Sequence, residues 1–302
     1  MTVSLFRRAA RVTVYRSEVG SFGDPATNGL EITDLRVQFA ITKGTGSDPN
    51  TCEMVITNAA PDTRASLTKK PLHVRIDAGY DDDLKHLFRG DLRYGASSFQ
   101  PPEWFTKLQI ADGDRAYRHA KSSRSYKRGT TVLTALKDVA ATMGLALPAN
   151  ALVSADLKAQ FASGEVIHGP SRDELTKLLA PYGYRWSIQD GKLVILKEAE
   201  TRPDRALVVS QATGMIGSPE FGVPDKSGKT PALTVKMLLY PAITPGGKIE
   251  IQSRTINGVF KVEKVTHTGD THGDDWFTEV ECKPVTVNKV QTVAAAVGRS
   301  LL

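Results

Sequence analysis

The stretch LEITDLRVQFAIT, residues 30–42, decides the fold class of this chain. Within it, Leu35, Val37, Phe39 and Ile41 occupy every second position. Successive side chains of a strand point to opposite faces, so this alternation predicts a strand with one buried face.

The neighbouring segments repeat the alternation. A loop rich in Gly, Ser, Asp and Pro (KGTGSDPN, 43–50) precedes TCEMVITNA at 51–59, and further alternating segments lie at 72–79, 86–99 and 104–110. Short alternating strands at this spacing are typical of an antiparallel barrel or sandwich. We therefore assign residues 1–114 to an N-terminal β-barrel domain.

The pattern changes after Asp114. The segment RAYRHAKSSRSYKR, residues 115–128, carries six basic side chains and no acidic one. They are Arg115, Arg118, Lys121, Arg124, Lys127 and Arg128. Tyr117 and Tyr126 interleave with these cations. This combination suits a position on the wall of a channel, or contact with an anion or a nucleic acid. A solvated connection between two domains is the alternative reading, and it is the simpler one.

Two helices and a hairpin are expected downstream of the basic segment. The first helix has its apolar residues on one face and a glycine placed to end it: Val132, Leu136, Val139, Met143 and Gly144. In the second, Ser171 and Glu174 form a capping-box pattern, and Pro181 follows the apolar face. YRWSIQDGKLVILK, residues 184–197, predicts a hairpin that turns at Asp190–Gly191. We assign residues 115–202 to an inserted α/β domain.

Alternating strands resume at Leu207, and we assign residues 203–286 to a second β-barrel domain. The segment 287–302 has apolar residues at the spacing of an amphipathic helix: Val287, Val290, Val293, Val297 and Leu301. A helix this short is marginal alone, so the stripe needs a docking surface. We expect these residues to be assembly contacts on a neighbouring subunit or on the next tail component, with the chain's own barrel as the alternative. The fold class expected is mainly β, α+β, with a C-terminal helical tail.

The stretch VTHTGDTHGDDWFTEVEC, residues 265–282, raises the question of a metal site. Its candidate ligands are His267, Asp270, His272 and Asp275. A zinc site needs three or four ligands on rigid elements, whereas these residues lie between two alternating segments and include two glycines. We expect residues 267–275 to form a polar hairpin loop without a catalytic metal, and alanine at both histidines to leave folding nearly intact.

Composition bounds the remaining possibilities. The chain has 302 residues and a net charge of +6, which permits an anionic partner without implying one. No apolar run approaches the roughly 20 residues of a membrane span, and no secretory signal is expected. Cys52 and Cys282 lie in strand-like segments and are expected to be buried free thiols.

GVPDKSGKTP, residues 222–231, resembles a phosphate-binding loop, but Val223 stands where the motif needs glycine and Pro231 where a helix should begin. Nucleotide binding is therefore not expected.

The order of these segments resembles the tail baseplate hub proteins of bacteriophages, the group that includes the late control protein D family and the hub of phage Mu. The matching pieces lie over roughly residues 30–283 and include PNTCEMVITNA, LHVRIDAGY, LFRGDL, IADGDRAYRHAKSSRSYKRGTT, GPSRDELTKLLAPYGYRWSIQDGKLVIL, GMIGSPEFGV, LLYPAITPGGKIEIQS and NGVFKVEKVTHTGDTHGDDWFTEVEC. Each piece is a weak motif, and their order makes the likeness specific.

The resemblance implies a structural protein with no catalytic residue, cofactor or metal. It implies a ring of three subunits that joins the tail tube to the central spike and surrounds the passage for DNA or the tape measure protein. A tube or tube-initiator protein and the spike would be its partners. The protein would belong to the virion and be assembled in the host cytoplasm, without membrane insertion. Two alternatives stay open, namely a nucleic-acid-binding protein using residues 115–128 and a metal-dependent hydrolase using residues 267–275.

Overall fold

The computed structural model describes residues 7–16, 29–69, 72–80, 83–222 and 232–285. Strands dominate, and 13 of them form one sheet that is antiparallel except for one pair. Its strands in the N-terminal part are β1 (Arg8–Tyr15), β2 (Leu30–Ile32), β3 (Val37–Gly44), β4 (Thr51–Thr57), β5 (His73–Tyr80), β6 (Asp83–Gln100) and β7 (Glu103–Ala111). Those in the C-terminal part are β12 (Leu207–Ser210), β13 (Met215–Phe221), β14 (Leu233–Leu238), β15 (Lys248–Gln252), β16 (Asn257–Asp270) and β17 (Trp276–Pro284).

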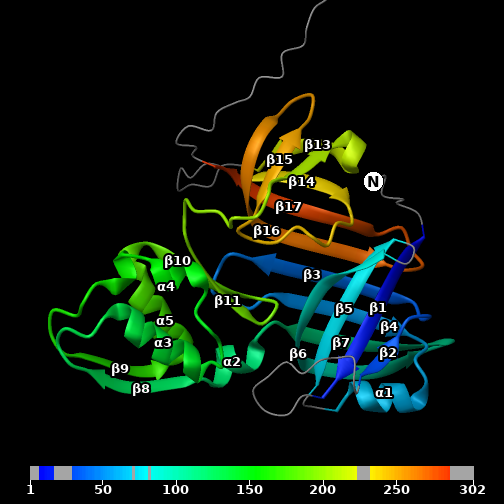
Figure 1. Ribbon diagram of the computed structural model, residues 1–302. Coiled ribbons are helices and arrows are strands. Elements are labelled where there is room, and N and C mark those ends of the chain that lie inside the picture. The colour runs from blue at the N-terminus through cyan, green and yellow to red at the C-terminus, as the bar shows by residue number, and fades with distance from the viewer. Residues whose placement is uncertain (1–6, 17–28, 70–71, 81–82, 223–231, 286–302) are drawn as a thin grey trace, which may run out of the picture.

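The two parts share this sheet and do not form two closed barrels. The main path runs β13-β14-β17-β16-β3-β4-β7-β6-β5-β1-β2, and the parallel β12–β15 pair attaches to β16 (Figure 1). The first half of β16 pairs with β15, and its second half, residues 264–270, pairs with β3. Its register with β17 shifts between Val262 and Lys264, where the partner on the other side changes. Within the described residues, the strands therefore form one shared sheet in place of the two β-barrels that we expected. A long strand joins the two parts, so neither has to close on itself.

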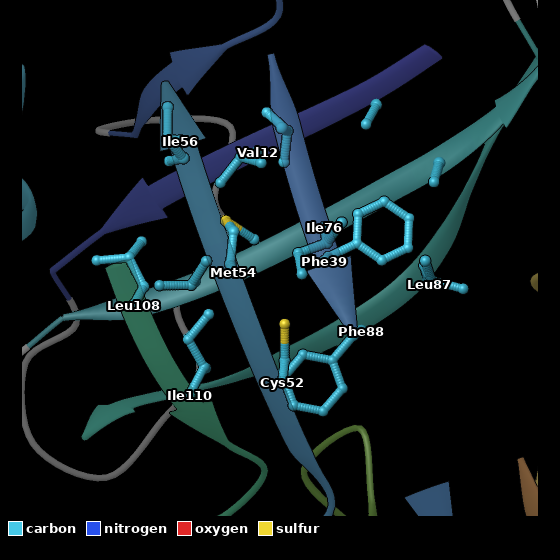
Figure 2. Packing of buried hydrophobic residues seen from close by; sticks show 14 of the residues in the cluster. Val12, Phe39, Cys52, Met54, Ile56, Ile76, Leu87, Phe88, Leu108 and Ile110 are labelled. Carbon is cyan, nitrogen blue, oxygen red and sulfur yellow. The ribbon is translucent and has the colours of Figure 1, made fainter. Parts of the chain in front are cut away.

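The alternation of β3 and β4 produces the core, as the sequence predicts. Val37, Phe39 and Ile41 are buried on one face of β3 and lie beside Ile56, Met54 and Cys52 of β4. Figure 2 shows Phe39 of β3 and Cys52, Met54 and Ile56 of β4 among buried residues from β1, β5, β6 and β7. Full burial of each large apolar side chain stabilises the fold by about 1.5–3 kcal/mol.

The seam between the two parts is closely packed. The ring of Phe39 lies 5.6 Å from the ring of Trp276 in an edge-to-face arrangement. Gly269 in β16 leaves room for it, since a Cβ there would lie 2.3 Å from Phe39 Cζ. The C-terminal part also has a core of its own, which includes Val235 and Ile251.

Residues 114–197 lie beside the large sheet and contribute no strand to it. They comprise α2 (Asp114–His119), β8 (Lys121–Tyr126), α3 (Val132–Thr142), α4 (Ala149–Val153), η1 (Asp156–Lys158), β9 (Glu165–Pro170), α5 (Ser171–Leu179), η2 (Ala180–Tyr182), β10 (Tyr184–Gln189) and β11 (Lys192–Lys197). Two-stranded sheets β8–β9 and β10–β11 flank the helices, and a separate apolar core joins them. The remaining described elements are α1 (Pro61–Leu67) and η3 (Gln211–Thr213). The domain boundaries given above stay a prediction.

The two predicted helices are present, but the capping box is not. In α3, the predicted apolar face is buried and Thr131 caps the first turn by accepting from the Thr134 N–H at 3.3 Å. In α5, Pro170 occupies the N-cap position and Ser171 lies inside the helix. The Ser171 hydroxyl is buried and contacts the Thr142 hydroxyl at 2.7 Å, so tertiary packing has replaced the local cap.

Candidate functional site

The histidine-rich stretch is mostly strand. β16 extends to Asp270 and β17 begins at Trp276, so the turn is shorter than the expected 267–275 loop. His267 is fully buried inside β16, and its Nδ1 lies 2.9 Å from the Thr278 hydroxyl on β17. Burial, followed by the nearby Lys43 charge, holds the pKa of His267 well below its usual value. A neutral imidazole in the sheet interior therefore replaces the expected loop histidine.

Asp270 clamps the start of β3 to the end of β16. Arg36 donates to both of its carboxylate oxygens, at 3.1 Å from Nε and 2.7 Å from Nη2. Gln38 Nε2 and the His272 N–H complete the set at 3.0 and 2.9 Å. The hydrogen bonds from Arg36 are the main cause that lowers the pKa of Asp270 to about 2. The Asp270 carboxylate is therefore occupied by hydrogen bonds that join the two parts of the sheet.

The four candidate metal ligands do not converge. Asp270 accepts from Arg36, while His272 Nδ1 contacts the neighbouring Thr271 hydroxyl. Across the described residues, no group of three or more His, Cys, Asp or Glu side chains is placed to hold a metal ion. The absence of a bound metal stays a prediction.

The six basic residues of the 115–128 segment are all exposed, but they are spread over two elements and a turn. Arg115 and Arg118 lie on α2, where Arg118 pairs with Asp114 at 3.0 Å. Lys121 and Arg124 lie on β8, and Arg124 pairs with Asp138 at 3.3 Å. The last two, Lys127 and Arg128, lie in the turn beyond β8. The six cations are therefore distributed over α2, β8 and the turn that follows β8.

Sequence reasoning missed the anchor that attaches the inserted unit to the large sheet. The β10–β11 turn, Asp190–Gly191, has left-handed backbone at both residues (φ of 51° and 71°). Their N–H groups donate to the two oxygens of the buried Asp112 carboxylate, at 2.5 and 2.8 Å. Arg89 of β6 donates to the Asp190 carbonyl oxygen, with its Nε at 2.7 Å. The hairpin turn is therefore held by two groups. Its N–H groups donate to the Asp112 carboxylate, and its carbonyl oxygen accepts from the Arg89 guanidinium.

Further polar contacts complete this anchor. Asn50 Nδ2 donates to the Ile188 carbonyl at 3.0 Å and to Gln189 Oε1 at 2.9 Å. Gln189 Nε2 in turn donates to the Gly44 carbonyl at 2.7 Å. Because these groups are largely buried, each unmade hydrogen bond would cost about 1–3 kcal/mol.

The charges of the anchor shift each other's pKa values. Burial raises the pKa of Asp112 to about 7, and the nearby Asp190 charge adds to this. Asp190 has its pKa lowered to about 2, because His86 at 3.1 Å and Lys43 at 3.7 Å outweigh its burial. The pKa of His86 is raised by Asp190 and Asp77 against its own burial. The only local signal was the Asp190–Gly191 turn, whose partners are all about 80 or more residues away in the chain.

The β6–β7 hairpin carries exposed aromatic side chains, two of them next to its turn. Tyr94, Phe99 and Trp104 are 54%, 52% and 37% exposed. The Phe99 and Trp104 rings lie 5.2 Å apart, and the Arg64 guanidinium lies 4.0 Å over the Trp104 ring. Aromatic and arginine side chains of this kind are enriched at protein–protein interfaces.

The family described as Baseplate hub gp41 matches residues 26–282, most of the chain. The protein belongs to the baseplate hub gp41 family. Membership makes it a structural, phage baseplate hub-type protein and a component of the virion tail. No curated protein matches the chain. In the part of the chain that the structure describes, no helix has the length and apolar character needed to span a bilayer.

Solved structures share the fold of this hub protein at low sequence identity. The 43 kDa tail protein of prophage MuSo2 from Shewanella oneidensis has a TM-score of 0.61 at 9% identity, covering 91% of this chain and 96% of its own. The tail protein from Neisseria meningitidis MC58 has a TM-score of 0.61 at 14% identity, with 92% and 96% covered. The E. coli c3393 protein, a component of the type VI secretion system, has a TM-score of 0.57 at 13% identity, with 83% and 73% covered.

Two predicted segments of the hub protein lie outside the described residues. One is the apolar stripe from Val287 to Leu301, and the other is most of the segment 222–231 that resembles a phosphate-binding loop. Both predictions stand on the sequence alone. Cys52 and Cys282 are described, and both are buried free thiols, as predicted.

Proposed function

We propose that this hub protein forms a trimeric ring that joins the tail tube to the central spike. The family match over residues 26–282 carries the proposal. In it, residues 1–114, 203–286 and 115–202 act as two hub domains and an inserted domain, and 287–302 as a docking tail. The ring would surround the passage for DNA or the tape measure protein and contact a tube or tube-initiator protein. Assembly would take place in the host cytoplasm, and no catalysis is required.

The exposed aromatic residues at the tip of the β6–β7 hairpin support an assembly role. Because the Phe99 and Trp104 rings contact each other and the Arg64 guanidinium lies over Trp104, these side chains lose little entropy on binding. The mass of the purified protein in solution tests the ring. We expect about three times the 32.7 kDa of one chain, measured by light scattering across a range of protein concentrations. A monomer at every concentration would contradict the ring, while family membership would stand.

The basic segment is proposed as a weak contact for anions passing through the ring. All six of its cations are exposed, and no carboxylate within the described residues forms an ion pair with Lys121, Lys127 or Arg128. Weak, salt-dependent binding to short single-stranded DNA is expected. Replacing Lys121, Lys127 and Arg128 with glutamine should lower the salt dependence, because fewer counterions are released. Equal binding by this variant at low salt would leave the segment as a solvated connection.

A further inference from the structure

His86 of β6 lies where the inserted unit contacts the large sheet. Its Nε2 lies 3.1 Å from Asp190 Oδ1 in the β10–β11 turn, and its Nδ1 lies 3.4 Å from Asp77 Oδ1 on β5. Both ring nitrogens therefore face carboxylate oxygens, one from the inserted unit and one from the sheet. The ring is partly exposed and lines a cleft of about 890 Å³ between the two, so water and protons reach it.

The protonation state of His86 decides whether both contacts are favourable. Burial acts to raise the pKa values of the two carboxylates, but His86 and neighbouring cations lower them, that of Asp190 to about 2. A charged carboxylate only accepts hydrogen bonds, and a neutral imidazole has a single N–H to donate. One of the two carboxylates would then face a nitrogen lone pair. The imidazolium donates from both nitrogens and carries a positive charge, so only this form joins Asp77 to Asp190.

Charged groups on every neighbouring element act on this contact. Burial and the Lys43 charge oppose protonation of His86, but Asp190 and Asp77 outweigh them and raise its pKa. Lys43 itself lies 3.7 Å from Asp190 Oδ1. The other titratable or charged side chains around the turn are Arg75 on β5, Arg89 on β6, Asp112 directly after β7 and the buried His267 on β16.

The inserted unit is built so that this contact can open. It contributes no strand to the large sheet and has an apolar core of its own. The turn can therefore shift without breaking a strand pair of the large sheet. Asn50 and Asp112 also hold the hairpin, through the Ile188 carbonyl and the N–H groups of the turn. Loss of the His86 contact should therefore loosen the turn and not detach the whole unit.

We propose that His86 is a pH-sensitive link between the large sheet and the inserted unit, which holds the β10–β11 turn in place when its ring is protonated and lets the turn open when the ring loses its proton. A group whose pKa is raised in the closed state stabilises that state fully below its usual pKa of 6.5. This contribution is lost as pH rises through the raised pKa. The inference goes beyond the hub role and does not depend on ring formation.

Hydrogen exchange of the full-length protein at about pH 5.5 and about pH 8.5 tests the link, with rates corrected for the intrinsic pH dependence of amide exchange. Peptides from residues 184–197 should lose protection at the higher pH relative to peptides from β3 and β4. In His86→Gln, whose side chain stays neutral, the hairpin should already be less protected at the lower pH. The loss of protection between the two pH values should be about 10-fold larger in wild type than in this variant, because one charge-assisted contact is at stake. Asp112 contributes to both proteins, so the difference between them reports His86.

The matched control is His168→Gln, which replaces an exposed histidine of the inserted unit away from the turn and should keep the wild-type pH dependence. A wild-type hairpin whose protection changes in parallel with β3 and β4 would overturn the proposal. An equal pH dependence in wild type and His86→Gln would overturn it too.

A second measurement needs no folded variant of His86. In wild-type protein labelled with ¹³C at histidine and ¹⁵N at glycine, the His86 ring and the Gly191 amide should titrate with one shared midpoint above the usual value of 6.5. A Gly191 signal that does not follow the ring, or a ring midpoint at or below that value, would contradict the link.

Discussion

At the residue scale, Asp112 shows how one buried carboxylate can fix the position of a whole unit. It accepts two N–H groups from a turn 78 and 79 residues later in the chain. The hydrogen bonds favour the charged carboxylate, while burial and Asp190 favour the neutral acid and raise the pKa to about 7. The pKa of Asp112 is therefore set by two opposing effects, the hydrogen bonds to the charged form and the burial of the group.

The raised pKa of Asp112 predicts the pH dependence of stability. A carboxyl group that holds its proton more tightly when folded stabilises the fold at low pH and loses that contribution as pH rises from about 4 to about 7. The raised pKa of His86 acts in the same direction. Asp112→Asn should be less stable than wild type at pH 5 by about 1–3 kcal/mol, because its amide group opposes an N–H donor. It should also lose less stability between pH 5 and pH 8, as measured by urea unfolding. Parallel pH profiles for the two proteins would refute this assignment.

The two histidines of the 265–282 stretch should differ sharply in their effect on folding. His267→Ala removes a buried ring and one of the hydrogen bonds of the Thr278 hydroxyl, so we expect a loss of about 2–4 kcal/mol in unfolding free energy. His272→Ala lies on the exposed turn and should change stability by less than about 0.5 kcal/mol. Elemental analysis of wild type should find no stoichiometric zinc. Zinc that is lost in His272→Ala would restore the metal-site hypothesis.

At the element scale, β16 decides the architecture because it serves both parts of the sheet. Its contact with β3 needs Gly269, over which the Phe39 ring lies. Gly269→Ala should destabilise the protein by about 1–3 kcal/mol, because the added methyl group overlaps the ring. Gly46→Ala is the matched control, since nothing lies within 4 Å of its Cβ position. Equal urea midpoints for the two variants would show that the seam adapts without cost.

At the scale of the whole molecule, assembly should depend on residues 287–302. Their stripe from Val287 to Leu301 is too short to form a stable helix alone, and we expect it to dock on a neighbouring subunit. Deletion of 287–302 should leave the unfolding transition of the remaining chain nearly unchanged but shift the mass in solution toward the monomer. Light scattering on matched concentrations of both proteins measures this. A truncated protein that assembles as well as the full chain would contradict the docking role.

The sequence by itself determined those elements that depend only on residues close to one another in the chain. The alternation in β3 and β4 follows from two-sided strands, the apolar face of α3 from helical spacing, and the hairpin at Asp190–Gly191 from the need for left-handed backbone. The order of these elements along the chain was enough to indicate the baseplate hub family, to which the match over residues 26–282 assigns the protein. Each of these conclusions depends on residues that are close in sequence.

Tertiary structure alone decided the pairings between distant segments. Alternation shows that β16 has a buried face but cannot say that its second half pairs with β3, 220 or more residues earlier. His267, which we expected in a loop, lies inside β16, between Thr278 of β17 and the remote Ile41 of β3. Asp112, Lys43 and His86 carry no local mark of their contact with the Asp190–Gly191 turn. Hydrogen bonds and charges act through space, so a single sequence records which groups are present but not which of them meet.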